Sequence, residues 1–357
     1  MISKHLDFKW SELNHQATFL FCLKLILSAF IVYTIEQYFQ WPKGFWAVLT
    51  VTAVIRPSIE HTCGKAIMRI LGTFIGGFLA YILMLLSHGN ILIITIGLLI
   101  ISTFSGLVIL HKGIISYAGV VIGLTAIVVL SDSLSLGYGH YGTVFIERTS
   151  LVMFGVFVAY TINILINILF KKERFNFNFM ANLKHAGDGL FDRARLKSSL
   201  PMALLLAMII LITYVPWLIW QTVGGYWAAI TCFFIIEERI LGIIGKGKLR
   251  FGAHFCAASL GIVGVLLSLL YPPLKIFTLC FGYIIAGYII VNAKNLSHTG
   301  NTFAIALTIM LLYDHQGIDT IEIVLLRFFY VLIGIIVGFI SIKLIGKYIQ
   351  KSKKIMF

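Results

Sequence analysis

The sequence predicts an all-α integral membrane protein with about twelve transmembrane helices, arranged as two six-helix repeats of the same orientation. Three observations lead to this fold class: an apolar composition, a one-sided distribution of positive charge and an internal repeat. Of the 357 residues, 59% are hydrophobic and only 12% are charged, and the mean hydropathy is +0.97. A soluble fold could not cover so much apolar surface with so little polar surface.

Apolar segments of the length of a helix follow one another along the chain, six on each side of a central polar stretch. They lie at roughly residues 17–39, 44–56, 66–86, 90–110, 113–131, 145–170, 200–220, 225–236, 249–270, 274–292, 299–313 and 322–345. We therefore divide the chain into a first repeat, a basic cytoplasmic linker, a second repeat and a basic cytoplasmic tail, at residues 1–170, 171–199, 200–346 and 347–357.

Positive charge separates the loops into two groups. If the N-terminus is cytoplasmic, the inner loops and tails carry 23 of the 28 lysines and arginines, and the outer loops carry two, Lys43 and Lys275. Loops that stay in the cytoplasm are enriched in Lys and Arg. The distribution predicts a multi-pass protein of the cell inner membrane with both termini in the cytoplasm. Lys24, Arg148 and Arg327 remain inside apolar segments or at their ends.

The two halves of the sequence resemble each other. Gly44–Thr50 matches Gly225–Thr231 at an offset of 181, and the same offset places Arg69 on Arg250. At an offset of 179, Arg148, Gly155 and Ala159 fall on Arg327, Gly334 and Gly338. Six segments per repeat give both halves one orientation, so a pseudo-two-fold axis along the membrane normal is expected. The interface between the halves is then the natural place for a pathway.

Two matched segments, 44–56 and 225–236, are shorter than the roughly 20 residues that cross a bilayer. Paired short segments at corresponding positions often mark the binding region of a transporter. Their backbone ends have to be buried by protein or line a cavity, because lipid offers no hydrogen bonds. The alternative is a short tilted span, completed by interfacial residues such as Trp41 and Lys43.

Several of these residues together resemble a known family. Gly44–Thr50, the Arg56-Pro57-Ser58 turn, Arg69–Gly77 and Arg148-Thr149 look like the fusaric acid resistance family, which includes bacterial aromatic acid exporters and is similar to plant aluminium-activated malate transporters. The resemblance covers most of 20–170 and recurs more weakly over 200–345. It implies export of small organic anions, often aromatic carboxylates. Three features depart from the family. In the second half, Glu237-Glu238-Arg239 replaces the Arg-Pro-Ser turn and Ala257-Ala258 replaces Gly76-Gly77. Only a short linker stands where many members carry a soluble domain.

Matched arginines and tryptophans are the candidate substrate-binding residues: Arg148, Arg327, Arg69, Arg250, Trp46 and Trp227. Arg148 and Arg327 begin the sixth and twelfth segments on the outer side, where positive charge is disfavoured. A guanidinium suits a carboxylate because it offers a planar fork of donors. The alternative is neutralisation by nearby acids, which are Glu147, Asp132, Glu322 and Asp314.

The other candidates also have two interpretations. Arg69 and Arg250 either draw anions into the inner mouth or anchor helix ends. Trp46 and Trp227 either stack on substrate or belong to an interfacial aromatic belt. Glu147 and His254 are the candidates for a proton relay, although a histidine satisfied inside the core is the simpler interpretation of His254. Acid is otherwise so scarce in the apolar segments that we expect membrane potential to drive export.

Other classes of protein are less compatible with the sequence. It has no phosphate-binding loop, no metal-ligand cluster and no paired catalytic carboxylates, so we expect no cofactor, no metal and no enzyme. The expected partners are a small organic anion and the lipid bilayer, a periplasmic adaptor protein is a further candidate, and nucleic acid is not expected. An anion channel and a non-transporting membrane scaffold or biogenesis factor remain as alternatives, and the oligomeric state is open.

Overall fold

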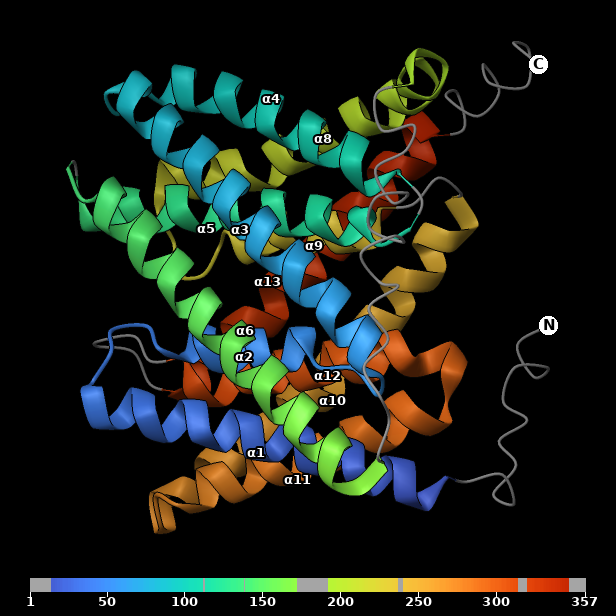
Figure 1. The fold of residues 1–357 in the computed structure, drawn as a ribbon. Helices are drawn as coiled ribbons and strands as arrows, with labels where there is room; N and C mark the ends of the chain where they lie inside the picture. Colours follow the sequence, from blue (N-terminus) through green and yellow to red (C-terminus); the bar gives the residue numbers. More distant parts are fainter. Residues whose placement is uncertain are drawn as a thin grey trace.

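The computed structural model describes residues 14–111, 113–137, 139–171, 192–236, 240–313 and 320–346, and within these ranges the regular structure is helical (Figure 1). The first half contains α1 (His15–Phe39), α2 (Phe45–Val54), α3 (Ile59–Ser87), α4 (Ile91–Ile109), α5 (Ile115–Leu136) and α6 (Tyr141–Lys171). The second half contains α8 (Arg193–Trp220), α9 (Trp227–Ile235), α10 (Ile240–Leu270), α11 (Leu274–Asn292), α12 (Ser297–Leu312) and α13 (Thr320–Ser341). Each of the predicted apolar segments therefore contains one helix.

Helix length divides these elements into two kinds. In the described part of the chain, 9 helices are long and apolar enough to cross a membrane. The helices α2 and α9 have 10 and 9 residues, and α12 has 16. At 1.5 Å per residue, α2 and α9 reach about half of the roughly 30 Å hydrocarbon core. Every side chain of α2 is buried, as are nearly all those of α9, so protein rather than lipid surrounds both half-length helices.

Three helices begin earlier than their apolar segments suggest. The helix α3 begins at Ile59 rather than near 66, α10 at Ile240 rather than near 249, and α8 at Arg193, inside the predicted linker. For α3 and α8 a capping side chain sets the start: Ser58 Oγ accepts a hydrogen bond from His61 N, and an Asp192 carboxylate oxygen accepts one from Ala194 N. Counting apolar residues misses such polar first turns. Residues 172–191 of the linker and the tail from 347 lie outside the described residues.

The two halves contact each other through corresponding helices. The helix α1 packs against α11 and α8 packs against α4, and Figure 1 shows these two pairs on opposite sides of the bundle. Closer to the centre, α2 packs against α12 and α9 packs against α5. The first and second helices of each half thus lie against the fourth and fifth of the other half. This arrangement places both half-length helices at the interface between the halves.

Matched glycines allow each half-length helix to approach the last long helix of its own half. A Cβ atom at Gly155 of α6 would overlap the carbonyl oxygen of Ala47 on α2. A Cβ atom at Gly334 of α13 would likewise overlap the carbonyl oxygen of Ala228 on α9. The side-chain neighbours, Cβ of Thr50 and Cβ of Thr231, would each lie 3.0 Å away. Small residues at helix interfaces permit such close backbone approach.

We expect Gly155→Leu and Gly334→Leu to disrupt this packing, because the obstructing atom is backbone and cannot rotate away. Overpacking of this kind typically costs about 1–3 kcal/mol of stability. The measurement is the yield of monodisperse protein in detergent and its thermal unfolding temperature. Gly142→Leu, on the same helix as Gly155, is the control, because the nearest atom to its added Cβ is Tyr81 Cε2 at 3.7 Å. Equal stability of Gly155→Leu and Gly142→Leu would contradict the prediction.

Candidate functional site

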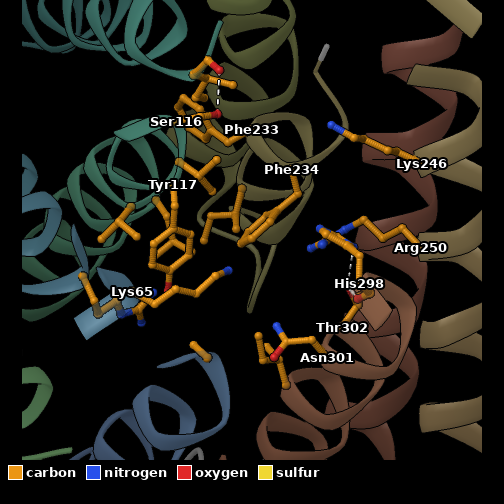
Figure 2. Close-up of a pocket in the computed structure, with 18 of the residues that line it drawn as sticks. Lys65, Ser116, Tyr117, Phe233, Phe234, Lys246, Arg250, His298, Asn301 and Thr302 are labelled. Atoms are coloured by element: carbon orange, nitrogen blue, oxygen red, sulfur yellow. Dashed lines mark hydrogen bonds between the residues drawn. The ribbon is translucent and has the colours of Figure 1, made fainter. Parts of the chain in front are cut away.

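A cavity of about 750 Å³ lies between the two halves. Its walls come from α2, α3, α4 and α5 of the first half and from α9, α10, α11, α12 and α13 of the second (Figure 2). It begins at Trp46 and Trp227 and follows the two half-length helices to their C-terminal ends. From there it continues to the α4–α5 turn, where His111 and Gly113 line it, and to Ser297 at the start of α12. Its volume is typical of a site for a small organic molecule.

Positive charge dominates this cavity. Among the described residues, its lining contains no Asp or Glu but six Lys or Arg side chains, namely Arg56, Lys65, Arg69, Lys246, Arg250 and Arg327. Three histidines, His111, His254 and His298, also line it. The lining residue Ile236 is followed by Glu237, Glu238 and Arg239, which lie outside the described residues. A recess of one charge sign between apolar walls concentrates ions of the opposite sign.

Several of these cations lie against aromatic rings or cross between the halves. Figure 2 shows Lys65 and Tyr117 on one side of the space and Arg250 on the other. Lys65 Nζ lies 4.2 Å from the Tyr117 ring centroid, and the Arg250 guanidinium lies 4.3 Å from the centroid of Phe234. Arg56 Nη1 donates a hydrogen bond of 2.9 Å to Asn301 Oδ1 on α12, which joins the α2–α3 loop to the second half.

At the end of the cavity that Trp46 and Trp227 line, four matched residues form what we call the Arg–Trp cluster. The rings of Trp46 and Trp227 stack with centroids 5.9 Å apart and planes 29° apart. The Arg148 guanidinium lies 3.4 Å from the Trp46 ring, and that of Arg327 lies 3.8 Å from the Trp227 ring. All four side chains are only 3–5% exposed. The sequence repeat thus becomes two equivalent cation–π pairs in contact.

The guanidinium groups of this cluster have hydrogen-bond donors without an acceptor among the described residues. All three guanidinium nitrogens of Arg148, and Nε and Nη1 of Arg327, are buried without a hydrogen-bond partner among the described residues. Of the acids proposed to neutralise them, Asp132 pairs with Lys43 at 2.8 Å, and Glu147 and Glu322 have exposed side chains. Asp314 lies outside the described residues. A cation–π contact contributes only about 0.5–2 kcal/mol and satisfies none of these donors.

The remaining candidates fall in different places. Arg69 and Arg250 line the cavity, and Nε and Nη2 of the buried Arg69 have no partner among the described residues. His254 also lines it, with Nδ1 2.9 Å from the carbonyl oxygen of Arg250. Glu147 lies on the exposed face of α6, away from the cavity lining, so the structure does not bring the two relay candidates together. The tryptophans are buried in the bundle rather than exposed in an interfacial belt.

Three lining cations, Arg56, Lys65 and Lys246, were not among the candidates from sequence. A signal for two of them exists, because the offset of 181 that places Arg69 on Arg250 also places Lys65 on Lys246. Because the positive-inside pattern already explained Lys65 and Lys246 as loop charges, this match between the halves was overlooked. In the structure they occur one helical turn before the arginines, on α3 and α10. Each half therefore contributes a matched lysine and arginine to the same cavity.

A family model described as fusaric acid resistance protein-like matches the chain twice, over residues 28–162 and 206–341. The chain belongs to this fusaric acid resistance family. The match confirms the resemblance seen in the sequence, and its two parts confirm the internal repeat. The family consists of membrane transport proteins rather than enzymes, so this is a multi-pass membrane transporter of the fusaric acid resistance type. Each matched region contains one Arg–Trp pair of the cluster. Comparison with curated proteins and with solved structures finds no match.

Proposed function

We propose that this transporter exports small organic anions, aromatic carboxylates among them, across the inner membrane through a pathway between its two repeats. The observation that carries the proposal is the lining of the cavity, which combines six Lys or Arg side chains with no acid among the described residues. Buried cations in a membrane protein are costly and generally mark an ion pathway. Organic anions are the substrates that such a lining attracts and that guanidinium groups bind.

The orientation of the cavity is inferred from the positive-inside pattern. We propose that both repeats have the same orientation and that the termini are cytoplasmic. The end of the cavity near Lys65, Lys246 and the α4–α5 turn then faces the cytoplasm, and the Arg–Trp cluster lies toward the outside. The structure would represent the inward-facing state of a carrier, in which an exporter takes up its substrate.

The alternatives are supported less well. An open anion channel would need a continuous path, whereas this cavity ends at two stacked tryptophans. A scaffold or biogenesis factor would not need buried arginines whose nitrogens lack partners among the described residues, because such groups are costly inside a bilayer.

We expect proteoliposomes containing this protein to transport benzoate in preference to its uncharged amide, benzamide. Arg69→Gln and Arg250→Gln should each raise the KM for benzoate about tenfold, because each removes a charge-assisted bond of about 1.5 kcal/mol. Arg193→Gln, at the exposed start of α8, is the control and should leave the KM unchanged. Equal transport of benzamide and benzoate, or a KM that neither cavity variant alters, would contradict the proposed function.

A further inference from the structure

The end of the cavity at Trp46 and Trp227 is covered by two aromatic layers. Trp46, Trp227 and Arg327 line the cavity, whereas Phe45 and Tyr226, which precede each tryptophan, do not. Phe45 and Tyr226 are nevertheless buried. Phe45 lies 4.7 Å from the Trp46 ring centroid and Tyr226 lies 5.4 Å from that of Trp227. A second layer of rings therefore covers the tryptophans on the side away from the cavity.

Two ring contacts join the halves at this closure: the stacking of the two tryptophan rings, and an edge-on contact of Phe45 with Tyr313, whose ring centroids lie 5.1 Å apart. Trp46 belongs to α2 of the first half and Trp227 to α9 of the second. Each arginine of the cluster comes from the last long helix of the same half as its tryptophan, α6 or α13. Separation of the halves at this point would break ring stacking and would not require any buried ion pair among the described residues to be broken.

We propose that the Arg–Trp cluster is the outer gate of the pathway and that the carboxylate of the transported anion opens it. This inference rests on the proposed function, because it requires an anion to arrive from the cavity. A carboxylate that reaches the guanidinium forms two parallel charge-assisted hydrogen bonds, which are stronger than its contact with the tryptophan ring. The guanidinium leaves the ring, the ring loses the cation that fixes its position, and the stacked pair separates.

The two arginines act at successive steps although their sequence positions match. Arg327 lines the cavity and is the first of the pair that an anion from this side meets. Arg148 does not line the cavity, and its three unpartnered nitrogens become accessible only after the tryptophans move. Arg327 therefore receives the anion, and Arg148 draws it past the rings. Without an anion the aromatic layers keep the pathway shut, which prevents leakage of other ions.

The test measures accessibility of the cavity from outside the cell. Leu49, one turn from Trp46 on the cavity side of α2, is replaced by cysteine in a chain in which the five natural cysteines have been replaced. A thiol reagent that does not cross membranes is applied from outside, with or without benzoate. We expect benzoate to accelerate labelling about tenfold and Trp46→Ala or Trp227→Ala to give fast labelling without it. Arg327→Gln removes the cation from the Trp227 ring, so it should also label fast without benzoate and show no further acceleration. Trp220→Ala, at an exposed tryptophan, is the matched control and should label like the parent.

Labelling from the cytoplasmic side should be fast in every variant, and the yield of monodisperse protein shows that each is folded. Slow outside labelling in both tryptophan variants would overturn the gate, even if benzoate is transported. Fast labelling of the tryptophan variants, together with no acceleration of the parent protein by benzoate, would support the position of the gate and overturn its opening by carboxylate. Absence of benzoate transport, measured separately in proteoliposomes, would contradict the proposed function and leave the effect of the tryptophan variants as evidence for a gate.

Discussion

Arg148→Ala and Arg327→Ala are each expected to reduce anion transport by about 10–100-fold while leaving the protein inserted and folded. The reduction corresponds to the loss of a charge-assisted hydrogen bond of about 1.5–3 kcal/mol to the anion. The protein should remain folded, because neither arginine is bonded to a buried acid among the described residues and removal leaves no unpaired partner charge. Transport in proteoliposomes and the yield of monodisperse protein measure the two effects.

Lysine at these positions distinguishes charge from geometry. Arg148→Lys should be poorly tolerated, because a lysine keeps the charge but loses both the planar donor fork and the flat contact with Trp46. The exposed Arg193→Lys is the matched control. If both alanine variants transport at the wild-type rate, the two arginines serve only to pack against the tryptophans.

Export is expected to follow the membrane potential and to need no pH gradient. An anion gains about 2.3 kcal/mol per charge for each 100 mV on leaving a negative interior, which corresponds to an accumulation ratio of about 50-fold. A carrier coupled to protons generally places carboxylates or histidines along its pathway. Here, in the described part of the chain, Glu36 is the one buried carboxylate, and it lies on α1 away from the cavity lining. The three histidines that line the cavity therefore have no carboxylate beside them in the described lining with which to form a relay.

Vesicles with an imposed potential and equal pH on both sides test this prediction. They should move benzoate out of the compartment that corresponds to the cytoplasm, and Glu36→Gln, Glu147→Gln and His254→Gln should leave the dependence on potential intact. Transport that responds only to a pH gradient and disappears in one of these variants would show a proton relay instead.

Local features of the sequence were enough to predict the class of fold. The helical segments, the half-length pair and the repeat follow from runs of apolar residues and from matched residues such as Trp46 with Trp227. Composition along a continuous segment decides whether it forms an apolar helix, and a repeated sequence folds in the same way twice. The starts of α3, α8 and α10 were wrong in the prediction, and for α3 and α8 the reason is that a helix can begin at a capping residue before its apolar run.

Contacts between residues far apart in the sequence depended on how the helices pack against one another. The sequence left both the arginine pair and the tryptophan pair with two interpretations. Only the tertiary structure placed Arg148 over Trp46 while Asp132 was taken by Lys43. Only the tertiary structure showed that Lys65 and Lys246, which the sequence placed among the loop charges, line the cavity. Which face of a helix meets which neighbour depends on close backbone approaches such as Gly155 against Ala47, and these are properties of two helices together that neither segment carries alone.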